Sequence, residues 1–167
     1  MRIIAGKFKG FRLTEIRGAD IRPTADRVRE ALFSVLTGRL EGSRVLDLFC
    51  GSGALGLEAK SRGASEVVFV DNADSSLAIL YKNLDKLSFD DARVIRQHHM
   101  RALAQLEKFG KPFDLIFLDP PYRKGLVQPT LDRLARSSLL AEGAIIVAEH
   151  ENELHSPRQV MELYRSE

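Results

Sequence analysis

Short runs of consecutive apolar residues alternate along the chain with stretches in which apolar residues recur every three or four positions. The runs predict strands buried on both faces, and the periodic stretches predict amphipathic helices. The predicted strands span 45–49, 66–71, 92–96, 113–118 and 144–148; the predicted helices span 23–37, 54–61, 75–87, 100–108 and 127–137. This alternation indicates an α/β fold with a doubly wound, mostly parallel sheet.

Two of the predicted helices carry a defined apolar stripe. The stripe of the first contains Val28, Ala31, Leu32, Val35 and Leu36, and the stripe of the third contains Leu77, Leu80, Tyr81, Leu84 and Leu87. Arg27 and Arg29 lie off the first stripe. Their side chains are therefore expected to face substrate, cofactor or water.

The N-terminal residues do not follow the helix–strand alternation. Two β-like pieces, Arg2–Ala5 and Phe8–Leu13, flank Gly6-Lys7 and predict a hairpin. The 167 residues are of ordinary size for one domain. We therefore expect a single domain, 1–167, with a basic N-terminal arm over 1–22 and an α/β core over 23–167.

The stretch RVLDLFCGSGALG, residues 44–56, combines a buried strand, a glycine turn and a helix start. Gly51, Gly53 and Gly56 have the spacing G-x-G-x-x-G, and Asp71 ends the next strand twenty residues after Gly51. This is the pattern of a βαβ nucleotide site with an acid placed for ribose hydroxyls. The candidate cofactor residues are Asp47, Phe49, Cys50, Gly51, Ser52, Gly53, Gly56, Asp71, Asn72 and His98.

A second motif, Asp119-Pro120-Pro121-Tyr122, ends the strand 113–118. The prolines stop the strand and remove two backbone donors. Hydrogen-bond acceptors on Asp119 and Pro120 then suit a substrate NH2 group, and the ring of Tyr122 suits a planar base stacked on it. These four residues are the candidate catalytic group; a rigid turn with a half-buried tyrosine is the structural alternative.

Charge is distributed unevenly along the chain. The net charge is +2, but residues 1–40 carry nine Lys and Arg against four acids, so this part is +5 and the remainder −3. A basic arm suits a phosphate backbone. The candidate nucleic-acid contacts are Arg2, Lys7, Lys9, Arg12, Arg22, Thr24, Arg27 and Arg29.

The cysteine content and the length of the apolar runs indicate the cellular compartment in which the protein is expected. The single cysteine, Cys50, excludes an internal disulfide and is compatible with a reducing cytosol. No apolar run reaches the roughly 18–20 residues that span a bilayer, and the N-terminus lacks the apolar region of a secretory signal. We expect a cytoplasmic protein without a metal site, because His98 and His99 have no evident third ligand.

FCGSGALG followed by DPPY resembles the class I S-adenosylmethionine-dependent amino-methyltransferases. RIIAGKFKGFR (residues 2–12) and RPTADRVREALF (residues 22–33) resemble, more narrowly, the RsmD family of bacterial 16S rRNA (guanine-N2)-methyltransferases. The resemblance extends from Arg2 to about Glu149. The family places an Asp after its fourth strand to hold adenine, where this chain has Gln97-His98-His99.

The resemblance implies a Rossmann-like methyltransferase with S-adenosylmethionine as cofactor. The substrate it implies is 16S rRNA, within the small ribosomal subunit or an assembly intermediate, with no obligate protein partner. DNA or another RNA with an exocyclic amine is the alternative substrate. A protein glutamine methyltransferase, which typically has Asn at position 119, an NAD-binding oxidoreductase and a non-catalytic RNA-binding module are weaker alternatives.

Overall fold

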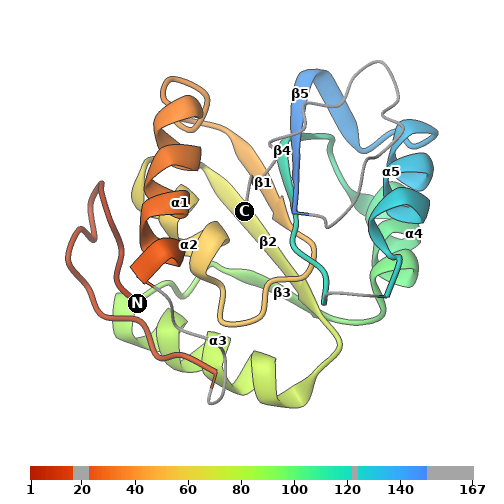
Figure 1. The fold of residues 1–167 in the computed structure, drawn as a ribbon. Helices are drawn as coiled ribbons and strands as arrows, with labels where there is room; N and C mark the ends of the chain where they lie inside the picture. Colours follow the sequence, from red (N-terminus) through yellow and green to blue (C-terminus); the bar gives the residue numbers. More distant parts are fainter. Residues whose placement is uncertain (17–22, 122–123, 150–167) are drawn as a thin grey trace.

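The computed structural model describes residues 1–16, 23–121 and 124–149, and these residues form a parallel sheet between two layers of helices (Figure 1). The strands are β1 (Arg44–Asp47), β2 (Glu66–Asp71), β3 (Arg93–Arg96), β4 (Phe113–Leu118) and β5 (Leu140–Ala148). The helices are α1 (Pro23–Val35), α2 (Ala54–Ser61), α3 (Asp74–Leu87), α4 (His99–Phe109) and α5 (Val127–Ala135). The prediction of an α/β fold is confirmed.

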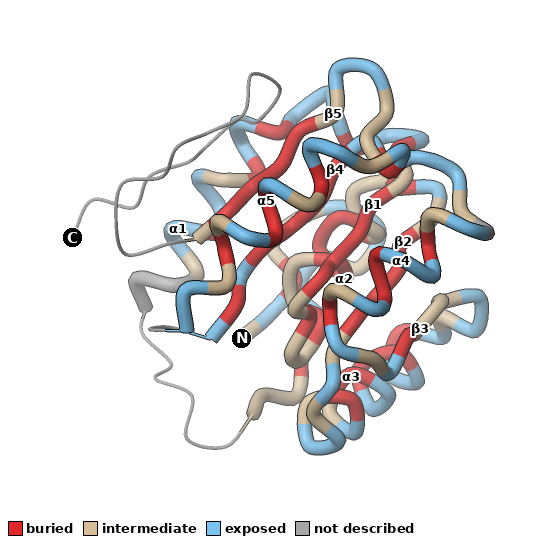
Figure 2. The backbone as a smooth tube through the Cα atoms, turned by 90° about the vertical axis from the view of Figure 1, so that its right-hand side faces the viewer, coloured by how far each residue is buried: buried red, intermediate tan, exposed pale blue. Residues whose placement is uncertain are grey.

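The five strands follow the order β3-β2-β1-β4-β5, and every neighbouring pair is parallel. Val45 lies beside Val67 on one side and Leu115 on the other, which aligns the three central strands along their length. Buried residues follow these strands almost without interruption (Figure 2). The apolar runs in the sequence therefore reflect a sheet that is covered on both faces.

Alternate residues of each strand enter two separate cores. Val45 and Phe117 point to the face covered by α1, α2 and α3, where they join Phe33 and Leu80. Leu46 and its neighbours on β4 point to the face covered by α4 and α5. The side-chain alternation of a strand thus divides one sheet between two helix layers, as a doubly wound fold requires.

Several expected boundaries and faces differ from the structure. Helix α1 ends at Val35 rather than Thr37, and β5 begins at Leu140 rather than Ala144. The expected α1 stripe is wrong in part: Val28 and Val35 are exposed, and Phe33, which the stripe left out, is buried. Leu36 is buried as expected. On α3 the expected leucines are buried, but Tyr81 is 50% exposed.

Residues 1–13 are called the arm from here on. The arm folds back on itself as an irregular loop instead of forming the two expected strands of a hairpin. A single antiparallel bridge joins Arg2 and Arg12, and the Ile3 N–H donates to the carbonyl of Phe11 at 2.9 Å. Ile3 and Leu13 are buried and continue the core beneath α1. The arm's remaining backbone bonds are divided between the arm itself and α2.

Side chains of α2 hold the arm in place. The carboxylate of Glu58, which is fully buried, accepts the N–H groups of Ile4 and Ala5 at 2.8 and 3.1 Å. The hydroxyl of Ser61 donates to the carbonyl of Ala5 at 2.6 Å and accepts from the N–H of Phe8 at 3.0 Å. The arm thus docks on α2, the helix that follows the glycine turn.

Candidate active site

The carboxyl ends of β1, β2 and β4 meet at one edge of the sheet. Asp47, the last residue of β1, lies in register with Phe69 of β2 and Phe117 of β4. Strand order reverses at β1, since the chain first builds β2 and β3 on one side and then β4 and β5 on the other. A ligand cleft in an open α/β sheet is expected at such a reversal.

Two glycines of the turn are required by close packing. A Cβ on Gly56 would lie 2.4 Å from Cε1 of Phe69 and 3.0 Å from Cγ1 of Val67, so α2 can approach β2 only without a side chain here. A Cβ on Gly53 would lie 2.4 Å from Cδ1 of Leu80, and Gly53 also has a φ of 84°. Glycine is therefore required at both positions for the turn and α2 to pack against β2 and α3.

Gly51 differs because its side-chain direction is open. Among residues 1–16, 23–121 and 124–149, the atom that a Cβ there would meet within 4 Å is Cδ1 of Ile16, at 3.7 Å, and the φ of Gly51 is 53°. The Gly51 N–H donates to Oδ2 of Asp71 at 2.9 Å, and the Ala73 N–H donates to Oδ1 at 2.9 Å. Each carboxylate oxygen of Asp71 keeps further acceptor capacity beside the open turn, which fits the ribose hydroxyls of a nucleoside cofactor.

Asp47 is almost completely buried below the turn. Its Oδ2 accepts the N–H of Gly56 at 2.9 Å. Burial raises the pKa of Asp47 to about 7, the bond from Gly56 lowers it, and the charge of Asp71 raises it. A cofactor that carries a positive charge would favour the ionised form of Asp47, so this buried carboxyl fits a sulfonium compound.

Cys50 is buried at the same edge, and burial together with Asp47 and Asp71 raises the pKa of its thiol. The thiol form is therefore the stable one, which agrees with a small packing residue and not with a nucleophile.

His98 and His99 lie in different environments. His98 precedes α4 and is exposed, whereas His99 is buried with its ring centroid 4.9 Å from that of Phe49. Burial lowers the pKa of His99, with a smaller contribution from His98. His98 and the exposed Asn72 remain candidates for cofactor contact, while His99 packs against the ring of Phe49.

The acceptor motif follows β4 directly. Leu118 ends the strand, Asp119 and Pro121 are exposed, and Pro120 is buried. Asp119 therefore lies at the same sheet edge as Asp47 and Asp71. Tyr122 lies outside the described residues, as does Arg22 of the candidate nucleic-acid set, and the side chain of Thr24 is likewise not described.

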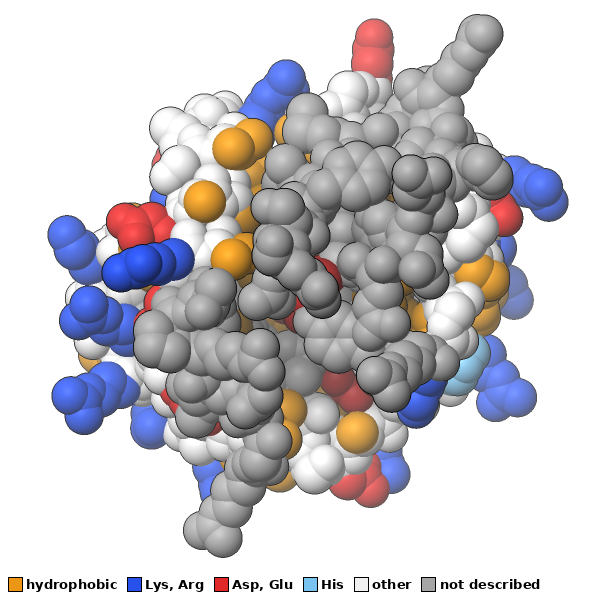
Figure 3. Space-filling view, in the orientation of Figure 1, with side chains coloured by type: hydrophobic (Ala, Val, Ile, Leu, Met, Phe, Trp, Pro, Cys, Tyr) orange, Lys and Arg blue, Asp and Glu red, His pale blue; other side chains and the backbone are white. Residues whose placement is uncertain are grey.

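The remaining arginines and lysines of that set divide into two groups. Arg2, Lys7, Lys9, Arg12 and Arg27 are exposed. Lys and Arg side chains lie along the left edge of the molecule in Figure 3, the side on which Figure 1 shows the arm, and along the right edge as well.

Arg29 corrects the expected surface position. It is 6% exposed, and its guanidinium donates to the carbonyl of Arg2 and to Asp26. Burial lowers the pKa of Arg29. The side chain fastens the arm to α1 and is withdrawn from the nucleic-acid set.

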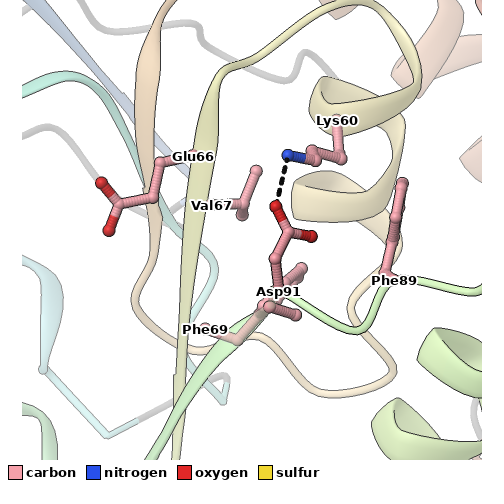
Figure 4. A pocket seen from close by; sticks show the side chains of 7 residues that line it. Lys60, Glu66, Val67, Phe69, Phe89 and Asp91 are labelled. Atoms are coloured by element: carbon pink, nitrogen blue, oxygen red, sulfur yellow. Dashed lines mark hydrogen bonds and ion pairs between the residues drawn. The ribbon is translucent and has the colours of Figure 1, made fainter.

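Two hollows lie beside the arm, away from the glycine turn. Figure 4 shows the smaller one, where Lys60 reaches to within 3.5 Å of Asp91; it holds roughly 10 Å³, about one water molecule. The larger one, about 510 Å³, is an open groove lined partly by Lys7, Phe8 and Phe11. Phe11 is 46% exposed, so the groove combines an exposed aromatic ring with three lysines and one acid, Asp91.

Asn83 and Glu58 are fully buried polar residues that were not among the predicted site residues. Asn83 is three residues after Leu80 and four before Leu87, so its place on the buried stripe of α3 was a readable signal. Glu58 had no such signal, because it binds backbone groups of the distant arm.

Metal sites and membrane-spanning helices are both absent from the part of the chain that the structure describes. Within 1–16, 23–121 and 124–149, no three His, Cys, Asp or Glu side chains are grouped so as to hold a metal ion. In the same part of the chain, none of the helices has the length and apolar character needed to cross a membrane.

Comparisons with known proteins agree on one family. Residues 1–167 match the model of the family described as Conserved hypothetical protein 95. Ribosomal RNA small subunit methyltransferase D of Escherichia coli (strain K12) is 40% identical over 153 residues, covering 92% of this chain and 76% of that protein.

Solved structures give the same result. The "Putative methyltransferase yhhF" of Escherichia coli superimposes with a TM-score of 0.83 at 40% identity, covering 95% of this chain and 86% of that one. A SAM-dependent methyltransferase of Agrobacterium tumefaciens has a TM-score of 0.52 at 27% identity, covering 66% of this chain and 36% of that one.

Proposed function

Because the chain belongs to the family described as Conserved hypothetical protein 95, we propose that it methylates the exocyclic N2 amine of a guanine in 16S rRNA. The resemblance to the RsmD family is confirmed, and the chain is a methyltransferase with a Rossmann-like fold. S-adenosylmethionine is the cofactor, and ribosomal RNA is the substrate class that the family supports. The guanine N2 position, and an intact small subunit or assembly intermediate as substrate, are our proposals.

The observation that carries the proposal is the position of Asp119. It immediately follows β4, next to β1 and its glycine turn, so acceptors for an amine adjoin the cofactor edge. When bound, S-adenosylmethionine supplies a methyl group activated by a sulfonium. The open direction at Gly51, the acceptor oxygens of Asp71 and the buried carboxyl of Asp47 fit its nucleoside and its positive charge.

Asp119 and Pro120 would act on the nitrogen of the substrate. The lone pair of a guanine N2 amine is delocalised into the ring, so the amine is a poor nucleophile. Acceptance of its N–H bonds by the Asp119 carboxylate and the Pro120 carbonyl favours a tetrahedral nitrogen that can attack. Holding that nitrogen in line with the methyl group provides much of the remaining acceleration.

Two further roles belong to the same motif. Asp119 or water would remove the proton that the methylated nitrogen carries after transfer. Tyr122 would stack on a guanine that has left its helical stack. Neither the proton removal nor the stacking requires a covalent intermediate on the protein.

The RNA backbone is proposed to follow the arm. Arg2, Lys7, Lys9 and Arg12 are exposed on it, and Arg27 is exposed on α1. The groove of about 510 Å³ beside Lys7 and Phe11 combines positive charge with an exposed ring. This combination suits single-stranded RNA, because phosphates bind cations and bases stack on aromatic rings.

The test uses radiolabelled S-adenosylmethionine with two substrates: 30S subunits that lack native methylation, and naked 16S rRNA. Nuclease digestion and chromatography identify the labelled nucleoside. We expect N2-methylguanosine from the wild-type protein, none from Asp119→Ala, and normal label from Asp132→Ala, which removes an exposed carboxylate on α5.

Three outcomes would overturn parts of the proposal. Label in N6-methyladenosine or a methylated cytosine would replace guanine as the target. Label in duplex DNA but in neither RNA substrate would favour the DNA alternative. Full activity of Asp119→Ala would remove that residue from the chemistry.

A further inference from the structure

A fully buried amide joins the N-terminal arm to the glycine turn. Nδ2 of Asn83, on α3, donates to the carbonyl of Ser52 at 2.9 Å and to the carbonyl of Thr14 at 3.0 Å. Its Oδ1 accepts the N–H of Thr14 at 2.6 Å. One side chain thus holds the middle residue of the turn and the residue that follows the arm.

The orientation of this amide is fixed by its partners. The two carbonyls can only accept and the backbone N–H can only donate, so the nitrogen and oxygen of Asn83 cannot be exchanged. Both N–H bonds of the amide are used. A substitution that changes either end leaves buried backbone groups without their partner.

The segment after the arm also approaches the open side of the turn. Ile16 Cδ1 is the nearby atom that a Cβ on Gly51 would meet, at 3.7 Å. Lys86, one turn after Asn83 on α3, donates to the hydroxyl of Thr14 at 2.8 Å. Residues 14 and 16 therefore lie beside the place where a nucleoside would rest, and both are within four residues of the exposed Arg12.

We propose that Asn83 is a positioning residue that couples the arm to the cofactor turn, so that cofactor binding and RNA contact on the arm strengthen each other. A ligand that orders Ser52 also orders the Asn83 amide, and that amide holds the backbone of Thr14. The effect is reciprocal, because a coupling free energy acts equally on both sites. The RNA half of this inference rests on the proposed function; the cofactor half does not.

The first test uses hydrogen–deuterium exchange with S-adenosylhomocysteine as the probe. In the wild-type protein we expect the ligand to slow exchange at the arm amides of Ile3, Gly10 and Leu13 by about fivefold or more, the lower end of typical coupling. Asn83→Ala should lose this remote protection while the ligand still slows exchange at the turn. Asn83→Ser gives the same comparison with a smaller loss of polarity, and urea unfolding shows that each variant is folded.

The matched control is Thr14→Val. It removes the hydroxyl bond from Lys86 but keeps both backbone bonds to Asn83, so the remote protection should persist. A general loosening of the fold would affect both variants. The inference is overturned if the ligand does not slow exchange in the wild-type arm, or if Asn83→Ala keeps that effect.

The second test measures the affinity for S-adenosylhomocysteine with and without naked 16S rRNA. We expect the RNA to tighten binding about fivefold or more in the wild type and Thr14→Val, and less than twofold in Asn83→Ala. RNA binding without any change in wild-type ligand affinity would refute the coupling and leave the proposed function intact. If the wild type binds neither naked 16S rRNA nor 30S subunits that lack native methylation, the proposed function is refuted, and the exchange test still judges the cofactor half.

Discussion

The buried carboxyl of Asp47 makes a sharp prediction about stability and pH. Its pKa is about 7 in the folded protein against an ordinary value of 3.8. Folding therefore favours the neutral form, and the folded state binds more protons than the unfolded state between these two values. Stability must fall as the pH rises through this window.

The size of the effect follows from the two pKa values. Between pH 5 and pH 8 the unfolded carboxyl is ionised throughout, whereas the folded one loses its proton near pH 7. The contribution of Asp47 to the free energy of unfolding should decrease by about 2.5 kcal/mol over this range. Most of the decrease lies between pH 5 and pH 7.

The assay is urea unfolding of the wild type and Asp47→Asn at pH 5, 6, 7 and 8. The asparagine keeps an oxygen for the Gly56 N–H but has no charge to bury. Buried His99 changes stability in the opposite direction, because its pKa is lowered, but it is present in both proteins and cancels in their difference. The wild type should lose about 2.5 kcal/mol relative to the variant from pH 5 to pH 8; two parallel pH profiles would refute the reasoning.

Three further predictions concern packing, docking and charge. Gly56→Ala should cost about 1–3 kcal/mol in urea unfolding, because its Cβ would lie 2.4 Å from Phe69; an unchanged midpoint would show that α2 can move away. Glu58→Gln should weaken the acceptors of Ile4 and Ala5 and speed tryptic cleavage after Lys7 and Lys9, whereas Glu142→Gln, on the exposed surface, should not. Replacing Lys7 and Lys9 together by Glu should reduce the steepness with which log affinity for 16S rRNA falls with log salt, by about 1.4 or more in the magnitude of the slope. The same change at exposed Lys108 and Arg136, on the opposite helix layer, should leave the slope unchanged.

Residues whose role depends on local pattern could be predicted from the sequence. The apolar run that forms β4 was placed at its observed ends, and the spacing from Gly51 to Asp71 predicted a carboxylate beside the turn. Both features arise from neighbours along the chain or from the regular return of a βαβ unit. The main layers of the fold and the cofactor edge therefore follow from the order of residues alone.

Residues whose role depends on distant backbone groups could not be predicted in this way. Arg29 on α1 and Glu58 on α2 are charged residues on helices, for which solvent exposure is the usual expectation. Both are buried because the arm brings unpaired carbonyl and N–H groups against them. The β-like pattern of the arm did not indicate this docking, in which many of the arm's backbone groups bond to side chains of α1 and α2.

The docking of the arm through its backbone has an evolutionary consequence. Glu58 and Ser61 bind the main chain at Ile4, Ala5 and Phe8, and main-chain groups are the same whatever residue supplies them. The exposed side chains of the arm can therefore change without loosening its attachment. Selection, or a designer, could therefore change the surface that the arm presents while its attachment to α2 stays as it is.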